Sequence, residues 1–169
     1  MNLATIRTLF EYSAWATERI FTQAAALTPE QYMTPPNETM PSVRRILVHA
    51  LGAETLWLTR FRTGSSVISF GEDDFPDLAA LRQAWERQQE AMLAHLDTFT
   101  DDILAQPFGF ERRGVPLEMV LWQIFFQLIN HGTQHRSEVA ALFTEYGHSP
   151  GALDFMFFIL QRERSPAVD

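Results

Sequence analysis

The stretch LEMVLWQIFFQLINHGTQHRSEVAAL, residues 117–142, decides the fold of this chain. One set of its side chains recurs at alternating spacings of four and three residues: Leu117, Leu121, Ile124, Leu128, His131, His135, Glu138 and Leu142. That spacing is typical of the inward face of a helix in a helical bundle. Two imidazoles and a carboxylate therefore take positions where leucine would stabilise the fold more simply, and a ligand that satisfies them is expected.

The two histidines of this stretch have the spacing of a metal chelate. Four residues of α-helix bring the β-carbons of His131 and His135 to about 5–6 Å from each other, with the rings about 40° apart around the axis. A third histidine, His49, lies on the apolar side of another helical segment. Antiparallel neighbours in a bundle can bring such faces together, so the three histidines form a candidate site for one divalent metal ion.

Each of these histidines also has a simpler interpretation. A lone histidine on an apolar face is usually hydrogen-bonded to the backbone or to a carboxylate, and an isolated histidine pair leaves a metal site incomplete. His95 and His148 lack the setting of the other three and are expected to be structural or solvent-facing. The pair is also unlike that of a zinc protease, because Gly132 follows His131 where those enzymes place a glutamate base.

Three further long segments show helical periodicity. They run over residues 3–24, 42–63 and 78–99. The glycines and aromatics of residues 108–116 predict a hairpin-like loop, and a short apolar helix is expected at residues 153–160. With no linker or repeat, residues 1–169 are predicted to be one all-α domain, an antiparallel four-helix bundle with a short fifth C-terminal helix and a hairpin-like loop before helix four.

Composition limits the classes of function. The net charge is −8, and the 13 basic residues are all arginines that occur in ones and twos, so binding to nucleic acid is not expected. The chain has no cysteine, which fits a reducing compartment and means that any thiol chemistry needs an external thiol. No apolar run approaches the roughly 20 residues of a membrane span, and the N-terminus lacks a signal-peptide pattern, so a soluble cytoplasmic protein is expected.

Four short motifs carry a resemblance to a known family. They are Tyr12-Ser-Ala-Trp15-Ala, VRRILVHALGAE at residues 43–54, Asn130-His131 with His135-Arg136, and Gly147-His-Ser-Pro150. Over nearly its whole length the chain resembles the DinB/YfiT-like family of four-helix-bundle metalloenzymes. The resemblance implies that His49, His131 and His135 bind one divalent metal, typically nickel or zinc, with water completing the shell, and that the protein forms homodimers. The chain departs from the family pattern at Ser13 and Thr17, where asparagine is common.

Two classes of function are compatible with such a site. Three neutral imidazoles leave the double positive charge of a metal uncompensated, which suits activation of a water or a thiol. The first hypothesis is a metal-dependent enzyme that acts on a small electrophilic molecule. It would be either a hydrolase or an S-transferase that uses an external low-molecular-weight thiol, since relatives resemble thiol-dependent S-transferases. Glu138 is the candidate to orient a ligand or relay a proton. The second hypothesis is a non-catalytic, metal-stabilised helical-bundle dimer with a binding or stress-related role.

Overall fold

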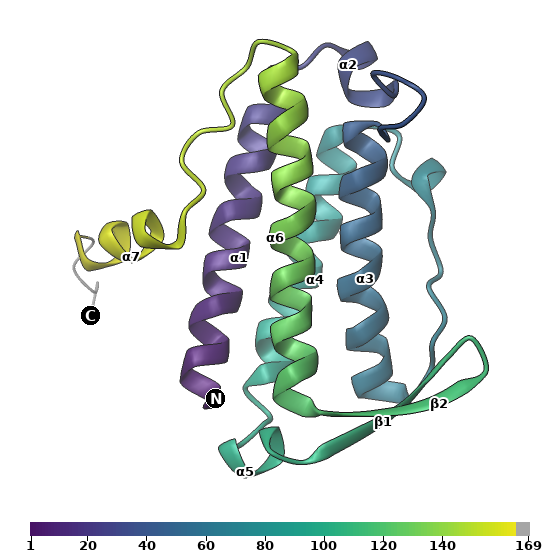
Figure 1. Ribbon diagram of the computed structural model, residues 1–169, viewed down its shortest axis with the longest axis vertical. Helices are drawn as coiled ribbons and strands as arrows, with labels where there is room; N and C mark the ends of the chain where they lie inside the picture. Colours follow the sequence, from purple (N-terminus) through teal and green to yellow (C-terminus); the bar gives the residue numbers. More distant parts are fainter. Residues whose placement is uncertain (165–169) are drawn as a thin grey trace.

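Four long helices form the body of the protein in a computed structural model that describes residues 1–164 (Figure 1). They are α1 (Leu3–Ala24), α3 (Val43–Thr63), α4 (Leu78–Leu96) and α6 (Leu121–Glu145). Helices α1 and α3 each pack against both α4 and α6. The predicted four-helix bundle is therefore confirmed.

Three of the four long helices begin where the sequence offers a capping side chain. The side chains of Asn2, Ser42 and Asp77 each accept a hydrogen bond from a backbone N–H in the first turn of α1, α3 and α4. Gly64 ends α3 with a φ of 72°, a left-handed conformation that glycine adopts without strain. Three short helices between the long ones were not predicted: α2 (Pro29–Met33), the 3-10 helix η1 (Glu72–Asp74) and α5 (Asp101–Leu104).

The direction of the helices follows from the long connection after α3. Residues 64–77 run back along the bundle, so that α4 starts at the same end as α3 and runs the same way (Figure 1). Helices α1 and α6 run parallel to each other and opposite to α3 and α4. As a result α3 and α6, which carry the candidate histidines, are antiparallel neighbours in contact along their length.

A β-hairpin closes the end of the bundle where α3 finishes. Strands β1 (Pro107–Arg112) and β2 (Val115–Val120) pair antiparallel, and Arg113 and Gly114 between them have φ values of 53° and 79°, as in a type I′ turn. Alternate side chains of β1 face the bundle, where Phe108 packs on Phe61 and Phe110 on Trp57. The predicted hairpin-like loop is thus a regular hairpin.

The hairpin corrects one detail of the predicted fourth helix. Leu117 was expected to begin its inward face, but Leu117 lies in β2 opposite Phe110, and α6 begins at Leu121. The pattern of apolar residues in Val115-Pro-Leu-Glu-Met-Val120 fits a strand as well as it fits a helix. Pairing with β1 satisfies its backbone, so the strand is formed.

The C-terminal helix α7 (Phe155–Arg164) begins two residues later than expected and lies beside α1, extending away from the bundle (Figure 1). It is attached mainly through Phe158, which is buried and contacts the rings of Tyr12 and Trp15. Its other large apolar side chains are 40–58% exposed: Phe155, Met156, Phe157 and Leu160. Phe155 meets the ring of Tyr12 edge-on, so the apolar strip is only partly covered within residues 1–164.

None of the helices within residues 1–164 combines the length and apolar character that crossing a bilayer requires.

Candidate metal centre

The structure brings the three predicted histidines together. His49 comes from α3, and His131 and His135 come from successive turns of α6. One ring nitrogen from each lies within 4.8 Å of the other two, and the Nε2 atoms of His131 and His135 are 3.2 Å apart. Zinc–nitrogen bonds of 2.0–2.1 Å in a tetrahedral site separate ligand nitrogens by about 3.3 Å, so a small closing movement of His49 is enough to fit a metal ion.

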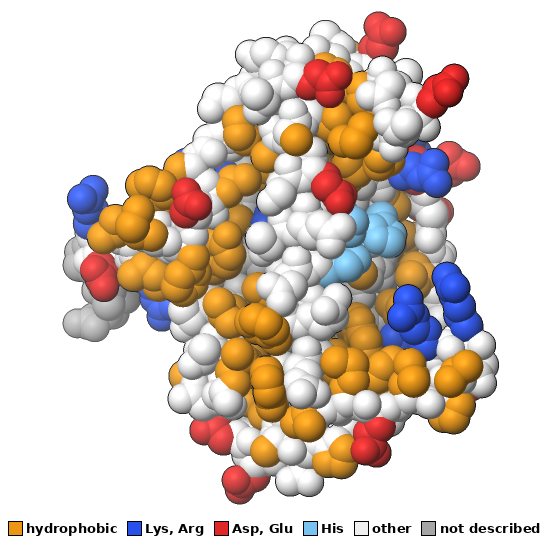
Figure 2. All heavy atoms as spheres, in the orientation of Figure 1, with side chains coloured by type: hydrophobic (Ala, Val, Ile, Leu, Met, Phe, Trp, Pro, Cys, Tyr) orange, Lys and Arg blue, Asp and Glu red, His pale blue; other side chains and the backbone are white. Residues whose placement is uncertain are grey.

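The position of this cluster differs from the prediction. The histidines were expected on core-facing stripes of their helices, but His49 is exposed and His131 and His135 are only half-buried. The buried side of α6 runs instead through Leu128, Gly132, Arg136, Val139 and Leu142. Figure 2 shows the histidine side chains, in pale blue, at the surface of the molecule beside α6. A metal ion bound there would be accessible from solvent.

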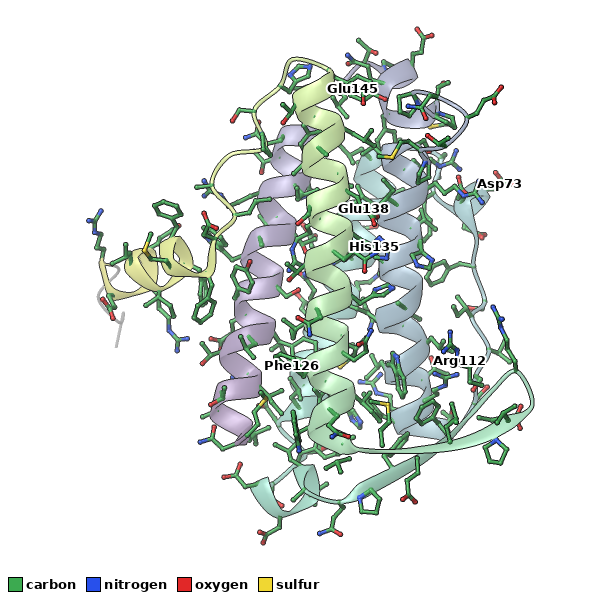
Figure 3. All side chains as sticks on the ribbon, viewed as in Figure 1. Asp73, Arg112, Phe126, His135, Glu138 and Glu145 are labelled. Atoms are coloured by element: carbon green, nitrogen blue, oxygen red, sulfur yellow. The ribbon has the colours of Figure 1, made fainter. Side chains whose placement is uncertain are left out.

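Glu138 fixes the orientation of one ring. Its Oε2 lies 2.7 Å from Nδ1 of His135, and the two side chains lie next to each other in Figure 3. The carboxylate accepts a hydrogen bond from Nδ1–H, which leaves the lone pair of Nε2 directed toward the cluster. Partial burial opposes ionisation of Glu138, but hydrogen bonds from Gln134 and His135 lower its pKa overall, so that it is ionised at neutral pH.

Two of the three histidines have pKa values shifted toward the neutral form. Burial, followed by repulsion from His135 and His49, lowers the pKa of His131 from 6.5 to about 4. The pKa of His49 is also lowered, first by burial and then by His135. Because a metal ion competes with protons for imidazole nitrogens, these shifts favour metal binding at neutral pH.

A buried arginine lies directly behind the histidines. Arg136, which is 5% exposed, donates hydrogen bonds from Nη1 to Oγ of Ser13 at 2.8 Å and from Nη2 to Oγ1 of Thr133 at 3.0 Å. Thr17 Oγ1 lies 3.5 Å from the same Nη1. Ser13 and Thr17 are the two positions at which the sequence departs from the family pattern, and the structure makes both of them acceptors for this guanidinium.

Glu54 is the acidic group that faces this arginine from α3. It is 5% exposed, and burial raises its pKa from 4.5 to about 7, although the charge of Arg136 opposes the shift. Glu54 lies about 140° from His49 around the helix, and its burial gives it a packing role away from the histidine cluster. The burial of Arg136 was not predicted from the sequence. Its charge on a helix of strong apolar character was the available signal that it needs a buried partner.

Gly132 leaves room for this guanidinium. A Cβ at Gly132 would lie 2.9 Å from Nη1 of Arg136 and 3.6 Å from Oγ of Ser13. The position is buried, so a glutamate of the zinc-protease type has no space here. The absence of that base from the sequence therefore has a steric explanation in the structure.

We expect Gly132→Ala to destabilise the protein. Alanine normally stabilises a helix by about 1 kcal/mol relative to glycine, but displacing the hydrogen-bonded guanidinium costs about 1–3 kcal/mol, as in overpacked cores. The expected net loss is about 1 kcal/mol in urea unfolding. Asn130→Ala, at an exposed position of the same helix, is the control and should be neutral or stabilising. Equal stabilisation by both substitutions would contradict this interpretation of Gly132.

The remaining two histidines lie apart from the cluster, as expected. His95 stacks on Phe61 and meets Phe99 edge-to-face near the hairpin end of the bundle. His148 follows the end of α6, where its backbone N–H donates to the carbonyl of Phe143. Neither ring belongs to the three-histidine group.

Comparisons with known proteins agree with this architecture. The model of the DinB family matches residues 1–165. Protein DinB of Bacillus subtilis is 21% identical over 94% of this chain and 96% of its own length. YfiT of Bacillus subtilis, described as a probable metal-dependent hydrolase with an unusual four-helix bundle topology, has a TM-score of 0.66 at 18% identity, covering 85% of this chain and 86% of YfiT. A DinB-like protein of Bacillus cereus has a TM-score of 0.60 at 18% identity, covering 85% and 94% of the two chains.

Proposed function

The chain belongs to the DinB family, and on that premise we propose that it is a metal-dependent enzyme whose ligands are His49, His131 and His135. The metal is one divalent ion, zinc or nickel, and the substrate is a small electrophilic molecule that is hydrolysed or receives an external thiol. The observation that carries this proposal is the convergence of three imidazole nitrogens from two helices at a solvent-accessible position.

The donor set suits catalysis. A divalent ion held by three neutral imidazoles retains its full charge and lowers the pKa of a water or thiol beside it. His49 is exposed, which leaves the solvent side of the centre open for a substrate, in contrast to the closed shell of a structural zinc site. Glu138 holds the ring of His135 in place and is available at the edge of the site to accept a proton.

Two observations bear on the reaction type. The similarity to YfiT, described as a probable metal-dependent hydrolase, favours hydrolysis. The chain has no cysteine of its own, so transfer of sulfur would require a low-molecular-weight thiol as co-substrate. In the alternative function, a non-catalytic bundle, the metal would join α3 to α6 and raise stability without turnover of any substrate.

We further propose that the protein is a cytoplasmic homodimer that binds small molecules. The apolar strip of α7, made of Phe155, Met156, Phe157 and Leu160, would be covered in a homodimer. Absence of cysteine is consistent with the cytoplasm. The acidic net charge favours small-molecule partners over nucleic acid.

Activity is tested with zinc-loaded and nickel-loaded protein against a panel of esters and amides, and against electrophiles offered with small thiols. We expect turnover that disappears on metal removal and in His131→Ala. A metal that raises the melting temperature while no member of the panel reacts would favour the non-catalytic bundle. Equal turnover by the wild type and His131→Ala would refute the assignment of the site.

We expect Glu138→Gln to weaken metal binding about 10–100-fold, the usual effect of removing the partner of a metal-binding histidine. Glutamine retains the size of the side chain but removes the charge that holds the proton on Nδ1 of His135. Competition with a chromophoric chelator measures the affinity. Glu145→Gln, an equal change of charge at the exposed end of α6, should leave it unchanged.

A further inference from the structure

A second polar feature lies on the hairpin, on the same face of the molecule as the histidines. Successive side chains of a strand alternate between faces, and Phe108 and Phe110 of β1 point toward the bundle. Arg112 is the next residue in this alternation, so its side chain lies on the bundle-facing side of the strand (Figure 3). Arg113 lies in the turn and does not continue the series.

Arg60 of α3 lies beneath this arginine. It is 8% exposed and is held by hydrogen bonds from Nε to Oγ of Ser66 at 3.0 Å and from Nη2 to the carbonyl of Glu111 at 2.9 Å. Its guanidinium stacks over Trp57 at 4.7 Å and over Phe110 at 5.2 Å from the ring centroids. These contacts fix the orientation of the guanidinium before any ligand binds.

Within residues 1–164 the two arginines have no acidic partner. Burial lowers the pKa of Arg60, and the positive charge of Arg112 lowers it further. Among the ion pairs formed within residues 1–164, none includes Arg60 or Arg112. Two neighbouring guanidinium groups without a carboxylate are a favourable site for a planar or tetrahedral anion.

This arginine pair is aligned with the histidines along α3. Arg60 follows His49 by eleven residues of helix. The two side chains therefore leave the helix axis in directions that differ by only about 20°, and they are separated by about 16 Å along the axis. Figure 2 shows basic side chains, in blue, on the same face as the histidines, next to an apolar strip. On the hairpin, Val115 and Leu117 pair with Arg112 and Phe110 and are 55% and 42% exposed.

We propose that Arg60 and Arg112 bind the carboxylate or phosphate group of the substrate, whose apolar body extends from the hairpin along α3 and whose reactive end reaches the histidines. The substrate class is therefore a small amphiphilic anion. This inference rests on the proposed function for the location of the reacting end, whereas binding of the anion depends on the arginines alone.

The first test uses metal-free protein, so that it is independent of the histidine site. Octanoate and octyl phosphate are titrated while the indole N–H signal of Trp57 is followed by NMR, with octanol as the neutral probe. We expect saturable shifts with one or both anions and weak binding of octanol. Arg112→Gln should weaken anion binding about tenfold or more, since it removes a hydrogen-bonded charge.

The matched control is Arg113→Asn, which removes an equal charge one residue away and places in the turn a residue that tolerates its positive φ. It should leave anion binding within about twofold of the wild type, the range expected of a screened surface charge. Octanol binding as tightly as the anions, or equal losses in Arg112→Gln and Arg113→Asn, would overturn the arginine site.

A second test asks whether the two sites serve one ligand. Zinc-loaded protein is titrated with ω-mercaptoalkanoates of increasing chain length and with the matching alkanoates. We expect one range of lengths at which the thiol compound binds more tightly than the alkanoate, and loss of that advantage in Arg112→Gln. An advantage that is independent of length and of Arg112 would overturn the single-ligand proposal. A protein that binds no zinc but retains octanoate would refute only the proposed function.

Discussion

Replacing His131 or His49 by alanine is expected to lower zinc affinity about 100–1000-fold, because each ligand contributes roughly a quarter of the 10–16 kcal/mol of a complete zinc site. The two residues come from different helices, so equal losses in both variants are expected only if one ion joins α3 and α6. Elemental analysis of untagged protein that has never contacted a nickel column, followed by chelator competition, measures the effect. About one metal ion per chain is expected in the wild type.

His95→Ala and His148→Ala are the controls for these variants. Both rings lie outside the cluster, and metal content should be retained in each. If the wild type binds no metal after exposure to zinc, nickel and manganese, the three histidines are simply surface side chains. If His49→Ala alone keeps full affinity, the site is confined to α6 and a water or carboxylate takes the third position.

Arg136→Met is expected to cost about 3–5 kcal/mol of stability at pH 8, because it breaks buried hydrogen bonds and removes the charge that compensates the buried Glu54. The substitution leaves the hydroxyls of Ser13 and Thr133 without a donor and leaves Glu54 buried without an opposing charge. Urea unfolding monitored by circular dichroism measures the loss. A change below about 1 kcal/mol, typical of a surface position, would contradict the buried role of Arg136.

The loss should depend on pH in a defined direction. Burial raises the folded-state pKa of Glu54 from 4.5 to about 7, and Arg136 opposes this rise, so removing the arginine raises that pKa further. A carboxyl group whose pKa is higher in the folded state reduces stability as pH rises from 4.5 through the folded pKa. Arg136→Met should therefore be less destabilising at pH 5 than at pH 8. Adding Glu54→Gln should restore much of the stability at pH 8 and remove most of this pH dependence.

The periodicity of apolar residues was sufficient to predict the long helices from the sequence but insufficient to predict the shorter elements. The spacings of three and four residues in α1, α3, α4 and α6 are repeated over several turns, and capping residues marked three of the starts. Leu117 fits both a helix and a strand, and only its pairing with Phe110 selected the strand. The short helices α2 and α5 contain too few residues for a period to be visible.

The sequence by itself determined the membership in the family, the four-helix bundle and the proximity of His131 to His135, since four residues of helix place two side chains together whatever surrounds them. The tertiary structure decided that His49 joins them, because this requires α3 and α6 to be antiparallel with these residues at the same level. It also decided that the histidines face solvent while Arg136 is buried. Adjacent stripes of one helix differ by only 100° around its axis, and which of them is covered depends on how the neighbouring helices pack.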